Sequence, residues 1–231
     1  MADKPSRALV IYGDGLASAV HNNLHSFASR AACGFLSVRA SETEDERICR
    51  DLAQLLDAYD QTLSERFMGL RAAMITLGFH IMHDNELASK FLHLLGFSGN
   101  DVLEKYDFDL VFLHIMLNGF VGKILEKSHS GSAIGSRLHF SIILSYGYVS
   151  ETNSDLCLLC PCQSYTMKGG NIRHHHPMLI GQLQEGLTRR DTAATFFFED
   201  FKKNGASHAI LSDRFLHEVA FRLWKAPKYG A

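Results

Sequence analysis

An apolar run near the amino terminus, Ala8–Tyr12, constrains the fold of this chain more than any other segment, because no charged residue interrupts it. A short run that is apolar at every position is typical of a strand buried on both faces, as in parallel sheets. Gly13, Asp14 and Gly15 follow at once, and the two glycines permit a sharp turn and a close approach of the backbone to a ligand. Ligands of open α/β sheets bind beside the carboxyl ends of the strands, so we expect Asp14 to lie in a site.

Short apolar runs alternate with stretches of helical spacing along the rest of the chain, which is the pattern of βαβ units. The predicted strands are 8–12, 34–38, 109–115, 138–148 and 156–160. The predicted helices are 24–30, 43–60, 86–95, 120–127, 178–189, 191–203 and 212–224, and the run 70–77 fits either type. We therefore expect a single three-layer α/β domain over residues 1–231, with a mixed, mostly parallel sheet flanked by helices.

Composition limits the partners of such a domain. The chain has 231 residues and a formal net charge of −2, without the basic stripe that binding to a nucleic acid backbone requires. No apolar run approaches the roughly 20 residues that span a bilayer, and the first residues do not resemble a signal peptide. We expect a cytoplasmic protein that binds neither nucleic acid nor membrane. The cysteines number five, which fits reduced thiols better than a disulfide framework.

Asp14 and the histidine run 174–176 are the residues whose chemistry best suits a metal ion. Carboxylate and imidazole ligands suit Zn²⁺ or Mn²⁺. Adjacent residues of an extended segment point to opposite faces, so His174 and His176 would share one side while His175 faces away. The alternatives are that Asp14 caps a helix or turn and that the histidines belong to a solvated loop.

A second candidate site contains Cys157, Cys160 and Cys162. With one of the later histidines, Cys157 and Cys160 could hold a structural zinc ion. The leucines among them favour the alternative, a buried strand in which cysteine packs as a small hydrophobic residue.

The polar loop 163–171 follows these cysteines and contains two glycines and Lys168. Its backbone amides and Lys168 could hold an anion, although the loop lacks the glycine and lysine spacing of a P-loop. An ordinary turn is the alternative interpretation.

Several segments resemble known proteins. Ala8–Gly15 and Phe108–Ile115 are similar to the strands of the alkaline-phosphatase-like superfamily, and within it to the cofactor-independent phosphoglycerate mutases. A longer stretch resembles an uncharacterised family of plant proteins labelled mutase-like. The segments that carry this second resemblance are 145–147, 163–169, 173–180 and 213–221, within a stretch that runs from Arg137 to Ala231.

The resemblance implies a particular set of site residues. In that superfamily two divalent cations, held by Asp and His, polarise a phosphate. By position, Asp14 would be the metal ligand of the first strand, and His174 or His176 would belong to the last metal motif, just before a strand over Pro177–Ile180. Lys168 or Arg173 would contact the phosphate. The cation implied is Mn²⁺ or Zn²⁺.

The chain also departs from the pattern of the family. Residues 116–120 replace an expected Asp and His, and 146–149 stand where a Gly-Asp-His motif would be. Two functions are therefore open. One is a reduced relative of metal-dependent phosphatases or mutases that acts on or binds a phosphorylated small molecule. The other is a non-catalytic protein that binds a ligand or partner, with the apolar segments around Phe196–Phe198 and Phe215 packed on the sheet or on a second copy in a homo-oligomer.

Overall fold

The computed structural model describes residues 6–14, 22–39, 44–58, 67–76, 84–114, 118–145, 175–206 and 209–227. Seven strands in these ranges form one sheet. They are β1 (Arg7–Asp14), β2 (Ala32–Arg39), β3 (Ala72–Thr76), β6 (Leu110–His114), β7 (Leu138–Ser145), β8 (His175–Leu183) and β9 (Ile210–Leu211). The spatial order is β3-β6-β1-β7-β8-β2-β9. A separate two-stranded ribbon pairs β4 (Phe97–Ser98) with β5 (Asp101–Val102).

Strand direction makes the sheet mixed but mostly parallel, as the sequence predicted. β3, β6, β1 and β7 run parallel to one another, and β9 runs parallel to β2. β8 is antiparallel to both of its neighbours, β7 and β2. The expected α/β fold with a mixed, mostly parallel sheet is therefore confirmed.

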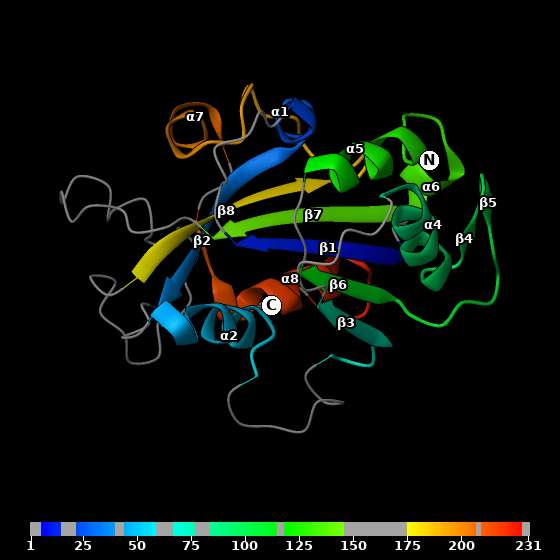
Figure 1. Ribbon diagram of the computed structural model, residues 1–231, viewed down its shortest axis with the longest axis horizontal. Coiled ribbons are helices and arrows are strands. Elements are labelled where there is room, and N and C mark those ends of the chain that lie inside the picture. The colour runs from blue at the N-terminus through cyan, green and yellow to red at the C-terminus, as the bar shows by residue number, and fades with distance from the viewer. Residues whose placement is uncertain are drawn as a thin grey trace.

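Helices cover both faces of this sheet (Figure 1). One face carries α1 (Asn22–Ala28), α4 (Asp84–Leu94), α5 (Asn118–Lys127) and α7 (Phe198–Asn204). The other face carries α2 (Glu44–Leu55) and α8 (Phe215–Arg222). The short α6 (Ala133–Arg137) leads into β7, and the 3₁₀ turn η3 (Ser212–Arg214) leads into α8. No helix in these ranges is both long and apolar enough to cross a bilayer.

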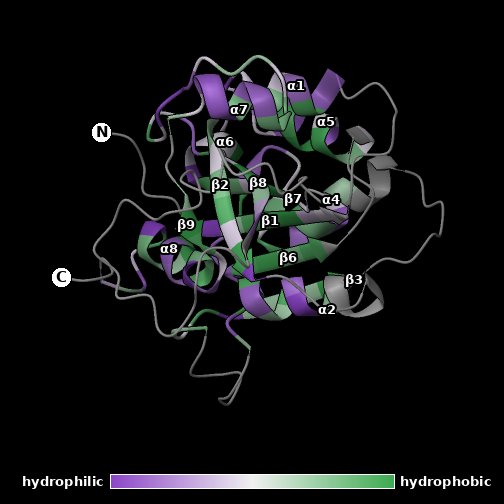
Figure 2. Ribbon diagram, turned by 90° about the vertical axis from the view of Figure 1, so that its left-hand side faces the viewer, coloured by the Kyte–Doolittle hydropathy of each residue, from purple (hydrophilic) through white to green (hydrophobic). Residues whose placement is uncertain are grey.

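The central strand β1 contributes to both hydrophobic layers. All side chains of Ala8–Tyr12 are fully buried. Leu9 and Ile11 pack under α1 and α5, whereas Val10 and Tyr12 pack under α2 and α8. Hydrophobic colouring is concentrated on the strands in the interior (Figure 2). The apolar run was therefore predicted correctly, and each large side chain in it contributes about 1.5–3 kcal/mol by burial.

The helix predicted over 178–189 is wrong, because residues up to Leu183 form β8. Met178 and Ile180 face one layer while Leu179 and Leu183 face the other, which is the alternation of a strand. The strand over Pro177–Ile180 that the family resemblance implied is present.

Other boundaries also differ from the predictions. The helix predicted over 191–203 is restricted to α7, because Asp200 accepts hydrogen bonds from the backbone N–H groups of Ala194 and Thr195 and so forms a turn before it. The helix predicted over 43–60 ends at Leu55. The ambiguous run 70–77 contains β3, and the strand predicted over 156–160 lies outside the described residues.

Aromatic residues of the last third pack against the sheet of the same chain. Phe196, Phe198, Phe215 and Leu216 are buried. Gly181 of β8 makes room for the Phe196 ring and for the Phe27 ring of α1, because a Cβ atom there would lie 3.0 Å from the first and 2.6 Å from the second. These side chains therefore pack on the sheet of their own chain, which is one of the two predicted alternatives.

β7 buries a histidine near its amino end. His139 is fully buried, and its Nε2 atom lies 3.1 Å from the hydroxyl of Ser141. Burial, with a smaller contribution from the positive charge of Arg222, lowers the pKa of His139 to about 3. The imidazole is therefore neutral at pH 7.

We expect Gly181→Ala to lower the free energy of unfolding by about 1–3 kcal/mol, because the new methyl group overlaps the Phe27 ring. Urea denaturation measures the change. Combining it with Phe27→Leu should make the cost of the methyl group smaller, because the ring is no longer there. Strictly additive costs would contradict this packing.

We also expect His139 to make stability depend on pH. Between pH 6.5 and about 3 the unfolded chain binds a proton that folded His139 does not, so the free energy of unfolding decreases as the pH falls. From pH 6.5 to pH 5 this amounts to about 2 kcal/mol. Urea denaturation at the two pH values should show a smaller loss in His139→Gln, and equal losses would contradict the shifted pKa.

Candidate functional site

The carboxyl ends of the parallel strands form one edge of the sheet, and polar residues occupy it. β1 ends at Asp14, which lies opposite Ser145, the last residue of β7. On the other side of β1, Tyr12 lies opposite His114, the last residue of β6. Ligands bind at this edge in open α/β sheets, which makes it the candidate functional site.

A buried carboxylate from α2 lies at the same edge. Tyr12 Oη donates a hydrogen bond to Asp51 Oδ2 over 3.1 Å, and Ser145 Oγ donates to the same oxygen over 3.4 Å. Asp51 is 5% exposed and Ser145 is 4% exposed. The two hydroxyl groups offset part of the cost of burying this carboxylate. Asp51 therefore joins the ends of the two central strands to α2.

Gln54, one turn further along α2, fixes the end of β2. The backbone N–H of Arg39 donates to Gln54 Oε1 over 2.7 Å, and Gln54 Nε2 donates to the carbonyl of Arg39 over 3.0 Å. The hydroxyl of Ser212, in η3, also donates to Gln54 Oε1, over 3.3 Å. These bonds hold α2, β2 and η3 together beside the candidate site.

Asp51 was not predicted as a site residue, although the sequence contains a signal for it. The helix predicted over 43–60 has an apolar stripe of Ile48, Leu52 and Leu55. Asp51 lies three residues after Ile48 and four before Leu55. A carboxylate inside such a stripe faces the core. An acidic residue at that position therefore indicates a buried polar contact.

His176 lies in β8, opposite Val38 of β2. It is half-buried, and loss of solvent lowers its pKa, which favours the neutral imidazole that metals bind. β7 separates β8 from β1, and His176 is offset by two residues along β8, so the backbones at Asp14 and His176 are about 12 Å apart. Met178, not His176, lies opposite Ser145. The register thus places both residues at the same edge but not as immediate neighbours.

The remaining predicted ligands lie outside the described residues. These are Lys168, Arg173 and His174, together with the cysteines Cys157, Cys160 and Cys162. Of the other two cysteines, Cys33 is buried and Cys49 exposed, and both are free thiols. Burial raises the pKa of the Cys33 thiol, and the charge of Asp191 adds to this, so the thiol is unreactive.

Among the side chains that the structure describes, no three of His, Cys, Asp and Glu are grouped so that they could hold a metal ion. The side chain of Asp14 is not one of these, and neither are those of His114 and of residues 146–174. A ligand set of three at this edge would therefore include at least one residue whose side chain the structure does not describe.

The comparisons with known proteins bear on the fold. No protein-family model matches the chain, and neither does any curated protein. Among solved structures, the chain is similar to the PH0037 protein from Pyrococcus horikoshii, with a TM-score of 0.56 and 12% sequence identity over 100% of both chains. At this identity the likeness supports the fold alone, and it extends over the whole length of both chains.

We expect Tyr12→Phe to lower the free energy of unfolding by about 1–3 kcal/mol, because the Asp51 carboxylate stays buried and loses its shorter hydrogen bond. Ser145→Ala should cost less, since its contact with Asp51 is longer. Urea denaturation of the two variants checks both values. A Tyr12→Phe protein as stable as the wild type would contradict the role given to this network.

Proposed function

We propose that this chain binds a phosphorylated small molecule through a divalent cation at the carboxyl edge of the sheet. It would be a reduced relative of the metal-dependent phosphatases and cofactor-independent phosphoglycerate mutases that its sequence resembles. One observation carries the proposal: Asp14 lies opposite Ser145, whose hydroxyl is bonded to the buried Asp51. Two acidic residues and a hydroxyl group thus belong to the ends of the two central strands and the helix beside them.

The negative charge of the acidic residues at this edge is the reason for including a divalent cation in the proposal. Asp14 and Asp51 are acidic, and the negative charges of their carboxylates and of a phosphate repel one another. A divalent cation between the carboxylates and the phosphate would attract both and so offset their repulsion. When bound, it would also polarise the phosphoryl oxygens. Asp14 would be a ligand, with His174 or His176 as the nitrogen donor, and this donor set suits Mn²⁺ or Zn²⁺. The neutral form of His176 that burial favours is the form that coordinates a metal.

Residues of the chain would fix the strand ends at the site and would neutralise the charge of the phosphate. Asp51 and Gln54 hold α2 against the ends of β7 and β2, which fixes the strand ends that bear Ser145 and Arg39. Lys168 and Arg173 would neutralise the phosphate oxygens that the cation does not contact.

A specific observation favours the second candidate function, a non-catalytic binding protein. Ser145 and Asp51 are buried and bonded to each other, so both side chains already serve the structure. In that function these two residues would support a binding site, and neither would act as a nucleophile. A measurement of catalytic turnover distinguishes the two candidate functions.

We expect calorimetry to detect binding of Mn²⁺ to the wild-type protein and a loss of affinity of at least tenfold in Asp14→Asn. Removing the charge leaves the shape of the side chain almost unchanged, so the effect reports on ligation. Asp107→Asn is the matched control, because Asp107 is exposed and precedes β6 at the opposite edge of the sheet. Inorganic phosphate should then bind only when Mn²⁺ is present.

Hydrolysis of para-nitrophenyl phosphate measures catalysis in the same proteins. Turnover that requires Asp14 would show a metal-dependent phosphatase, whereas metal-dependent phosphate binding without turnover would show the non-catalytic function. A wild-type protein that binds neither Mn²⁺ nor phosphate, or an Asp14→Asn protein that binds both normally, would overturn the proposal.

A further inference from the structure

A cavity of about 180 Å³ lies at the other end of the sheet. Its lining residues are His139, Gln184, Leu187, Phe221, Arg222 and Trp224. His139 is the second residue of β7, and Gln184 follows the last residue of the antiparallel β8, so both lie at the amino edge of the parallel strands. Ser145 lies six residues after His139 along β7, a distance of about 20 Å. The cavity is therefore distinct from the candidate site at the carboxyl edge.

Three polar atoms of the lining residues are buried without a hydrogen-bond partner in the described part of the chain. They are His139 Nδ1, Gln184 Oε1 and Arg222 Nε. The opposite ends of two of these side chains are engaged, because His139 Nε2 contacts Ser141 and Gln184 Nε2 donates to the carbonyl of Ser136 over 2.9 Å. Buried polar atoms are rarely left unpaired in folded proteins. Their presence around one cavity points to a polar ligand.

Arg222 supplies the charge of this cavity, since it is the one Lys, Arg, Asp or Glu residue among the six that line it. His139 is neutral at pH 7, because burial and Arg222 lower its pKa to about 3. Burial also lowers the pKa of Arg222, which Glu218 on the same helix partly opposes. A partly buried guanidinium group with an unpaired N–H binds carboxylates well.

The remaining lining residues form an exposed apolar wall. Leu187 is 51% exposed, Phe221 is 38% exposed and Trp224 is 68% exposed. The only other large hydrophobic side chains with such exposure in the described ranges are Met74 and Phe197, so more than half of these side chains gather at this cavity. An aromatic ring could lie against them.

Trp224 has an unusual backbone conformation for an aromatic residue, with φ of 61°. It occupies the left-handed position after α8, where Trp224 N donates to the carbonyl of Phe221 and Lys225 N donates to the carbonyl of Ala220. This is the Schellman arrangement, in which glycine is the favoured residue. A tryptophan held there at a cost in strain indicates a role for its side chain.

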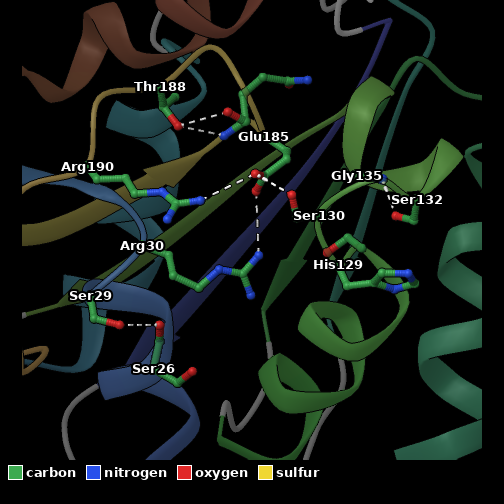
Figure 3. A network of polar contacts seen from close by, with 12 residues as sticks. Ser26, Ser29, Arg30, His129, Ser130, Ser132, Gly135, Glu185, Thr188 and Arg190 are labelled. Atoms are coloured by element: carbon green, nitrogen blue, oxygen red, sulfur yellow. Dashed lines mark hydrogen bonds and ion pairs between the residues drawn. The ribbon is translucent and has the colours of Figure 1, made fainter. Parts of the chain in front are cut away.

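Hydrogen bonds and ion pairs fix the segment 184–188, which contributes Gln184 and Leu187 to the cavity (Figure 3). The hydroxyl of Thr188 bonds both the N–H and the carbonyl of Gln184, which closes the turn that bears Leu187. Next to Gln184, the Glu185 carboxylate contacts Arg30, Arg190 and the hydroxyl of Ser130. The cavity is thus formed before a ligand arrives, which lowers the entropic cost of binding.

We infer that this cavity binds a small aromatic carboxylate that also carries a hydrogen-bond donor. The carboxylate lies against Arg222, the ring lies against Trp224 and Phe221, and the donor reaches Gln184 Oε1. The inference is independent of the function proposed for the carboxyl edge, because no residue is shared between the two sites.

The fluorescence of the protein reports directly on this cavity, since Trp224 is the one tryptophan of the chain. We expect 4-hydroxyphenylacetate to change the emission of Trp224 saturably. The matched ligand 4-hydroxyphenylethanol lacks the carboxylate and should bind at least tenfold more weakly. Arg222→Gln should weaken binding of the acid at least tenfold, whereas Arg50→Gln, an exposed position on α2, should leave it unchanged.

A second variant tests the apolar wall. Trp224→Gly places the favoured residue at the end of α8, so the protein should fold at least as stably as the wild type. Calorimetry should nevertheless show binding of 4-hydroxyphenylacetate at least fivefold weaker. No saturable binding to the wild type, equal affinity for the acid and the alcohol, or normal affinity in folded Arg222→Gln or Trp224→Gly would each overturn the inference.

Discussion

The burial of Ala8–Tyr12 in β1, between β6 and β7, determines where polar chemistry can lie in this protein. Both faces and both sides of the strand are covered, so charged residues can occur only at its two ends. At the amino end, Arg7 donates to the carbonyl of Leu103 over 2.7 Å and stacks on the ring of Tyr106. Asp14 occupies the carboxyl end. Each end of β1 therefore carries a charge of its own, Arg7 at the amino end and Asp14 at the carboxyl end.

The two edges have opposite chemistry as a result. The carboxyl edge contains Asp14, Ser145 and the buried Asp51, and the cation-dependent binding that we propose rests on these acidic residues. The amino edge presents Arg222 beside an apolar wall, which suits an anion with a ring. A parallel sheet places these edges a strand length apart, so the two proposed ligands do not compete for space.

The strands buried on both faces could be predicted from the sequence, because an uninterrupted apolar run fits few other structures. β8 could not, since Met178, Leu179, Ile180 and Leu183 satisfy both helical spacing and strand alternation, and only pairing with β7 and β2 decides between them. Asp14 was identified as a candidate because a strand and its turn mark the position locally. The cavity at the amino edge had no such signal: its residues come from distant segments, and no glycine marks the end of α8 at Trp224.

A crystal structure of the protein soaked in Mn²⁺ and inorganic phosphate tests the metal site proposed at the carboxyl edge most directly, through the anomalous scattering of manganese. We predict one strong anomalous peak about 2.0–2.2 Å from a carboxylate oxygen of Asp14, with phosphate bound to the same ion. A peak confined to other parts of the surface, or phosphate bound at this edge with no metal beside it, would contradict the account.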